Sequence, residues 1–180
     1  VAARRECVAQ ALFFSSLLVR RSNSIMPRVQ DDLIKLEQSV RIRLGVVGLG
    51  ESWERRHKQA LLRMTDKFEV RALYDEVAHR TRMQAAELEC DAVDGFTCLI
   101  ERDDVDAVYL LGTSWCGVEP IRAACRVRKP IFLARPFGPT TPYADEAIEA
   151  LKSSGVRFMA EFPWRFYPAS IRLMELLASG

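Results

Sequence analysis

Short apolar runs alternate with amphipathic stretches along the chain from residue 41 onward. Each run is bounded by glycine, proline or charged residues, and each stretch between runs repeats its apolar residues at helical spacing. The runs predict strands over 41–48, 68–74, 92–93, 106–112, 130–134 and 156–161. The stretches predict helices over 53–65, 76–89, 96–102, 119–127, 142–153 and 169–178, with Gly155 ending the fifth.

Strands separated by helices of this length predict right-handed crossovers and a mostly parallel sheet with helices on both faces. The fold class is therefore α/β, a doubly wound Rossmann sheet in a single domain, and we expect the strand order 3-2-1-4-5-6. Ligands bind such sheets at the carboxyl ends of the strands, where the order reverses. That point lies between Gly48, after the first strand, and Gly112, after the fourth.

The chain divides into three parts on this pattern. Residues 1–40 read as an N-terminal extension, 41–161 as the dinucleotide-binding domain, and 162–180 as the start of a crossover helix toward a further domain. The apolar stretch 8–19, flanked by arginine pairs, leaves three interpretations open: an upstream extension, a targeting segment or an extra helix.

Composition narrows the functional classes. The net charge of +2 argues against nucleic acid as a partner, and residues 1–28 alone contribute five arginines against one glutamate. No apolar run is long enough to span a membrane. Five cysteines without a CxxC pair argue against a zinc site or a disulfide framework, and they favour small apolar residues in a reducing, cytoplasmic protein.

The strongest candidate site is the turn that follows the first strand, with the sequence Gly48, Leu49, Gly50, Glu51, Ser52, Trp53. Gly48 would allow a tight turn, and Gly50 would let the backbone approach a pyrophosphate at the start of a helix. Trp53 stands where the usual third glycine lets the helix pack closely, so we expect this helix to tilt or sit differently. The alternative is a turn that no longer binds a nucleotide.

Asp75 follows the second strand, where a carboxylate accepts hydrogen bonds from the adenosine ribose and repels a 2′-phosphate. This favours NAD as cofactor, with NADP still possible because His79 and Arg80 follow closely. The structural alternative for Asp75 is the N-cap of the helix over 76–89.

Further candidates follow the fourth and fifth strands. Thr113 and Ser114 would bind the cofactor or cap the next helix, and the neighbouring Trp115 would wall the nicotinamide pocket or cover the sheet edge. Arg135 would orient a ligand group in the crevice or form a surface ion pair. We expect His57, inside the first helix, to be a surface or partly buried residue. No catalytic triad and no metal-ligand spacing is present, so we assign no catalytic residue and no metal.

With these residues placed, the sequence from about residue 42 to 180 resembles the N-terminal half of the Gfo/Idh/MocA oxidoreductases. The resemblance is carried by the segments IRLGVVGLG, FEVRALYDEVAHR, DDVDAVYLLGTS, KPIFLARPFG and WRFYPASIRLMELLASG. It implies a cofactor of the NAD(P) type and hydride transfer on sugar or polyol-like substrates. It also implies a C-terminal domain that supplies the substrate pocket and an oligomer interface, and we expect that domain to lie outside these 180 residues.

The chain departs from the family at three positions. Arg135 replaces the lysine of the Glu-Lys-Pro motif, Ser114 replaces a proline, and Val118 occupies the place of a histidine. Arginine keeps the charge but does not transfer a proton near neutral pH. We therefore expect an NAD(P)-binding domain that is inactive or weak alone and needs a partner for its substrate. A non-catalytic nucleotide-binding or scaffold domain and a gene fragment remain alternatives. An unfinished chain also predicts exposed apolar side chains on the helix over 169–178.

Overall fold

The computed structural model describes residues 41–112, 115–134 and 143–179 and shows a six-stranded sheet in the order β3-β2-β1-β4-β5-β6. Every pair of neighbouring strands is parallel, which confirms the predicted class and strand order. The strands are β1 (Ile42–Val47), β2 (Phe68–Tyr74), β3 (Asp91–Ala92), β4 (Ala107–Leu110), β5 (Ile131–Leu133) and β6 (Phe158–Ala160).

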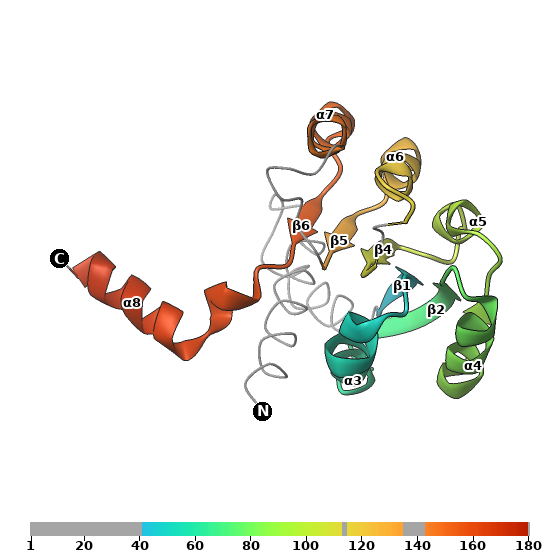
Figure 1. Ribbon diagram of the computed structural model, residues 1–180, viewed down its shortest axis with the longest axis horizontal. Coiled ribbons are helices and arrows are strands. Elements are labelled where there is room, and N and C mark those ends of the chain that lie inside the picture. Colours follow the sequence, from blue (N-terminus) through green and yellow to red (C-terminus); the bar gives the residue numbers. More distant parts are fainter. Residues whose placement is uncertain (1–40, 113–114, 135–142, 180) are drawn as a thin grey trace, which may run out of the picture.

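Helices cover both faces of the sheet, as Figure 1 shows along the strands. On one face lies the first helical segment, η1 (Trp53–His57) continued by α3 (Lys58–Leu62), together with α4 (Ala78–Leu88). On the other face lie α5 (Phe96–Ile100), α6 (Glu119–Arg126) and α7 (Ala144–Ser154). Gly155 adopts a left-handed conformation directly after α7, so the predicted helix stop is confirmed.

Each face of the sheet has its own apolar core. Leu44, Val46 and Tyr109 belong to the core beneath α3 and α4, whereas Val47 and Leu110 belong to the core beneath α5, α6 and α7. Side chains of a strand alternate between faces, and both faces are covered here, so the strands read as continuous apolar runs. This explains why hydrophobic runs located the central strands from sequence alone.

Element ends differ from the predicted ends by one or two residues at most places. The second helix begins at Ala78 rather than at residue 76, because the Asp75 carboxylate accepts the Val77 backbone N–H at 3.0 Å and shapes a turn before the helix. Val77 is the N-cap residue, so the prediction that Asp75 caps this helix is wrong. The short third strand begins one residue earlier than predicted.

The first helix departs most from a regular α-helix. Residues Trp53–His57 form a π-helical turn, in which the Lys58 backbone N–H donates to the Trp53 carbonyl five residues earlier. A π turn holds one residue more than an α turn, so it rotates the following side chains relative to the preceding ones. The expected irregularity at the third-glycine position is thus present, and it takes the form of a widened turn that starts at Trp53.

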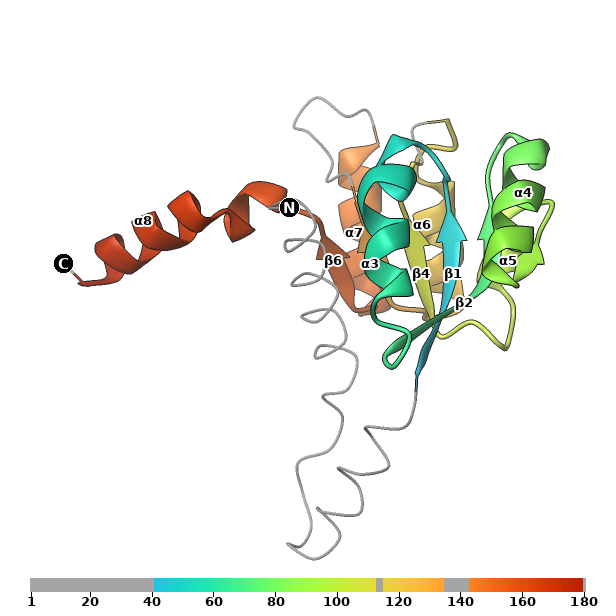
Figure 2. The ribbon, with the colours of Figure 1, turned by 90° about the horizontal axis from the view of Figure 1, so that it is seen from below.

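Beyond β6 the chain makes a short 3₁₀ turn, η2 (Pro163–Phe166), and the helix α8 (Pro168–Ser179). Figures 1 and 2 show α8 projecting away from the sheet, and none of its residues is buried. Its apolar side chains are exposed, as predicted: Ile171, Leu173, Met174, Leu176 and Leu177.

Within the described ranges, no helix is long and apolar enough to cross a bilayer. Four of the cysteines lie there, and all four are free thiols; no group of side chains in these ranges could hold a metal ion. Three of these cysteines are half-buried, but Cys98 is exposed, so the prediction that cysteines serve as buried apolar residues is wrong for Cys98.

Candidate dinucleotide site

The turn after β1 lies at the point where the strand order reverses. Gly48 has a φ of +90°, and its backbone N–H donates to the Tyr74 carbonyl at 2.8 Å. A Cβ added to Gly48 would come within 2.5 Å of the Gly112 backbone nitrogen, so the ends of β1 and β4 touch through two glycines. Only glycine combines this conformation with this close approach.

Gly50, unlike Gly48, has free space around the position of a Cβ. A Cβ added there would have no described atom within 4 Å, so the surface above Gly50 is open. The Glu54 N–H donates to the Gly50 carbonyl at 3.2 Å, which makes Gly50 part of the first helical turn. The N–H groups at such a helix start have no acceptor within the helix and attract anions. Glu51 and Ser52 continue this turn at the surface, with Glu51 exposed and Ser52 half-buried.

Trp53 does not occupy the turn. Its indole is fully buried in the core beneath α3 and α4, and its Nε1 donates to the Gln84 side-chain oxygen at 2.9 Å. The large side chain at the third-glycine position is thus accommodated in the core, against α4. The space that a pyrophosphate requires is left free of it.

Asp75 connects the glycine turn to the end of β2. One carboxylate oxygen accepts the Leu49 backbone N–H at 2.7 Å, and the other accepts the Val77 N–H and the Arg80 guanidinium, both at 3.0 Å. Asp75 is 4% exposed, whereas the Arg80 side chain is 43% exposed. Asp75 therefore fixes Leu49 in place, and Arg80 compensates its charge at the surface.

The remaining predicted residues, Thr113, Ser114 and Arg135, lie outside the described residues. Their neighbours are placed. Gly112 lies against Gly48, and the buried Ala134 follows β5, with its N–H bonded to the Leu110 carbonyl at 2.9 Å. The roles proposed for these three residues remain predictions.

Sequence reasoning missed a buried charged group next to the site. Glu161, directly after β6, is 1% exposed and pairs with both terminal nitrogens of Arg56 at 3.0 Å. His57 is fully buried, with its Nε2 3.5 Å from Glu161 and its ring edge-on against Tyr109. The expectation of a surface or partly buried histidine is therefore wrong. The π turn brings Arg56 and His57 to face the same carboxylate.

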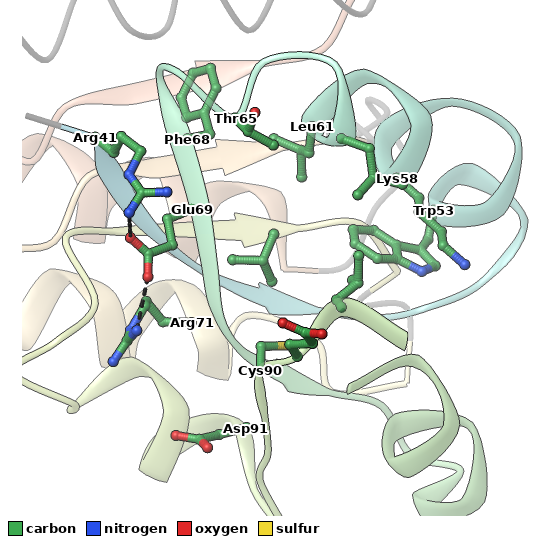
Figure 3. Close-up of a pocket in the computed structure, with 14 residues that line it drawn as sticks. Arg41, Trp53, Lys58, Leu61, Thr65, Phe68, Glu69, Arg71, Cys90 and Asp91 are labelled. Atoms are coloured by element: carbon green, nitrogen blue, oxygen red, sulfur yellow. Dashed lines mark hydrogen bonds and ion pairs between the residues drawn. The ribbon is translucent and has the colours of Figure 1, made fainter. Parts of the chain in front are cut away.

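Away from the glycine turn, a hollow of about 340 Å³ lies between α3, α4 and the beginning of β2 (Figure 3). Its rim carries the ion pairs of Glu69 with Arg41 and Arg71, at 3.0 and 2.8 Å. Phe68 starts β2, so this hollow opens toward the amino ends of the strands. Ligands of doubly wound sheets bind at the carboxyl ends, and we therefore do not assign the cofactor to it.

The family of the chain follows from comparison with known proteins. The Gfo/Idh/MocA model, described as an oxidoreductase family with an NAD-binding Rossmann fold, matches residues 42–162. The chain belongs to this family. The matched range begins at β1 and ends just after β6, so it coincides with the sheet described above.

Among curated relatives, the chain is 29% identical over 147 residues to the dTDP-3,4-didehydro-2,6-dideoxy-alpha-D-glucose 3-reductase of Streptomyces antibioticus. It is 24% identical over 139 residues to the 2,7-anhydro-N-acetylneuraminate hydratase of Escherichia coli K12. These matches cover 79% and 77% of this chain but only 43% and 36% of the relatives. The chain thus spans less than half the length of the relatives it matches.

Solved structures also match most of this chain, but this chain covers less than half of each of them. A probable dehydrogenase from Thermotoga maritima superposes with a TM-score of 0.69 at 27% identity, covering 77% of this chain and 41% of the other. A 3-ketoreductase from Actinomadura kijaniata, solved with NADP and TDP-benzene, superposes with a TM-score of 0.66 at 28% identity, covering 78% and 43%. This chain is therefore an NAD(P)-binding Rossmann domain of an oxidoreductase family.

Proposed function

We propose that the chain binds NAD(H) or NADP(H) with the pyrophosphate over the turn from Gly48 to Gly50. The open surface at Gly50, directly above a helix start, is the observation that carries this proposal. Gly48 keeps the ends of β1 and β4 in contact, and Asp75 holds the Leu49 amide in position. The residues at this edge fit the cofactor, because bare backbone and helix N–H groups recognise phosphate.

In this proposal the adenosine half lies over β2 and the nicotinamide half over β4 to β6. Asp75, at the end of β2, stands nearest the adenosine ribose, and Glu51 and Ser52 continue the turn beneath the phosphates. Thr113, Ser114 and Arg135 follow β4 and β5, so we assign them to the ribose and nicotinamide half. When bound, the nicotinamide supplies hydride transfer.

We further propose that this domain serves an oxidoreductase acting on a sugar or polyol-like substrate in the cytoplasm. Support comes from the relatives named for sugar derivatives and from the free thiols of the described part. A second chain or a further part would supply the substrate walls. Arg135 would orient a substrate oxygen by charge alone, since arginine does not exchange its proton near neutral pH.

Replacing Gly50 by alanine is expected to weaken cofactor binding without changing stability. The added methyl group meets no described atom in the protein but projects into the proposed pyrophosphate position. We expect the dissociation constants of NADH and NADPH to rise about tenfold or more, since overpacking costs on the order of 1–3 kcal/mol. Isothermal titration and thermal unfolding of both proteins measure the two effects.

The wild-type titration tests the proposed function itself. Absence of heat with both NADH and NADPH at millimolar concentration would reject cofactor binding by this chain. Wild-type affinity in the Gly50→Ala protein would reject only the position of the pyrophosphate.

Arg80 is expected to set the preference between the two cofactors. The 2′-phosphate of NADP would be repelled by Asp75, and Arg80 is the exposed cation already bonded to that carboxylate. Arg80→Gln should therefore weaken NADPH binding about tenfold while changing NADH binding less, as expected for a hydrogen bond to a charged group. Competitive titration of both cofactors gives the ratio.

Arg63→Gln is the matched control. This residue is exposed at the end of α3, toward the amino edge of the sheet, and loses the same charge away from the site. An equal loss for both cofactors in the Arg80 variant would contradict a role in discrimination.

A further inference from the structure

Three aromatic rings lie together near the carboxyl ends of the strands, close to the point where the strand order reverses. Tyr74 ends β2, Phe96 begins α5, and Trp115 follows β4. The indole of Trp115 lies 5.8 Å from the Tyr74 ring and 6.5 Å from the Phe96 ring, and Tyr74 and Phe96 are 6.3 Å apart. The three residues come from three different elements, so the cluster is a product of the fold.

The cluster lies on the adenosine side of the proposed site. Tyr74 immediately precedes Asp75, and its carbonyl accepts the Gly48 N–H. Trp115 follows Gly112, which contacts Gly48, yet the indole reaches back past β1 to the end of β2. The described ring contacts of Trp115 are thus with the end of β2 and the start of α5, on the side where the adenosine half is proposed.

Part of the Trp115 indole surface is exposed and could contact a ligand. Trp115 is 38% exposed, and its two described ring neighbours meet it at interplanar angles of 62° and 61°. Neither neighbour stacks parallel on it, whereas both restrict its orientation. A half-exposed indole held in this way offers a preorganised apolar surface.

Two titratable groups, the Tyr74 phenol and the Cys116 thiol, lie next to the indole, and the Glu76 carboxylate is close enough to act on both. Burial raises the pKa of the Tyr74 phenol above its ordinary value, and burial raises the pKa of the Cys116 thiol to about 11. Both groups are therefore neutral. With carboxylates nearby, this apolar surface suits a flat, neutral base better than a phosphate.

We propose that Trp115 is the residue on which the adenine of the cofactor stacks, with Tyr74 and Phe96 holding its indole in place. The inference rests on the proposed cofactor site and adds the contact that recognises the base. Every base has a π face, and stacking on an aromatic side chain is a general way to hold one. Stacking on Trp115 would not distinguish NAD from NADP; in this proposal the groups around Asp75 do so.

Replacing Trp115 by leucine tests the contact with ligand fragments. We expect about a tenfold rise in the dissociation constants of NADH and ADP-ribose in Trp115→Leu, and no change for nicotinamide mononucleotide. Trp115→Phe should recover most of the affinity. Trp164→Leu is the control, because Trp164 is exposed in η2 and its described ring contact is with Tyr167.

A spectroscopic readout does not require any change at Trp115. In Trp164→Leu the remaining tryptophans are Trp115 and the fully buried Trp53, so acrylamide quenching reports mainly on Trp115. Saturating ADP-ribose should protect this emission, and nicotinamide mononucleotide should not.

The outcomes separate the two proposals. Unchanged ADP-ribose affinity in a folded Trp115→Leu protein, or no protection from acrylamide while NADH binds, overturns adenine stacking and leaves cofactor binding standing. A wild-type chain that binds neither NADH nor ADP-ribose overturns both.

Discussion

Replacing Arg56 by methionine is expected to lower the free energy of unfolding by about 3 kcal/mol or more, because the buried Glu161 carboxylate loses its guanidinium partner. Glu161 is 1% exposed and accepts both Arg56 bonds at 3.0 Å. The Arg56 side chain is 23% exposed, so its own charge reaches water more easily than that of the carboxylate. Urea unfolding at neutral pH measures the difference.

Arg55 provides the matched control on the same helical turn. It pairs with Glu51 at 2.9 Å, but both side chains are more than 70% exposed, and such pairs contribute about 0–1 kcal/mol. The double variant Arg56→Met/Glu161→Leu should recover part of the loss, because apolar replacement of both partners removes the buried charge. Equal effects of Arg55→Met and Arg56→Met would show that Glu161 is solvated after all.

Gly48→Ala is expected to destabilise the sheet by about 3 kcal/mol or more, since strained backbone and overpacking each cost about 1–3 kcal/mol. The new Cβ would lie 2.5 Å from the Gly112 nitrogen and 2.8 Å from its Cα and oxygen. These are backbone atoms, so relief requires the ends of β1 and β4 to separate. Cofactor affinity should fall together with stability.

The Gly50→Ala protein is the control for the stability loss expected in Gly48→Ala. The two glycines are two positions apart, but only the Cβ at position 48 meets backbone. Circular dichroism melts should therefore distinguish the variants, with the position-50 protein unfolding like wild type. A position-48 variant that melts at the wild-type temperature would contradict the close approach of the two strand ends.

The sheet was predictable because its strands are buried on both faces. Burial on both sides makes each strand a continuous apolar run, and the helices between them fix the parallel order. The position of Asp75 beside the glycine turn was predictable for a related reason, since the end of a parallel strand is a defined position in space. The start of α4 was less predictable, because it depends on side-chain bonds from Asp75 that the hydrophobic pattern does not encode.

The π turn and the buried ion pair could not be predicted in this way. One additional residue in a helical turn leaves the periodicity of a short helix nearly unchanged, so Trp53 was the only sign of an irregularity. Glu161 is a single acidic residue after a strand, and its partner Arg56 is far away in the sequence. Its position after β6 was the available signal, the same one that drew attention to Arg135.

The pair formed by Arg56 and Glu161 joins residues 105 positions apart. Contacts of such separation form late, because the intervening chain must first be ordered. In a chain synthesised from its N-terminus, the residues of the glycine turn and of the first helix are present long before residue 161 is added. The first helix, which follows the proposed phosphate site, therefore gains this ion pair only when the last strand has joined the sheet, so the first and last segments of the domain become ordered together.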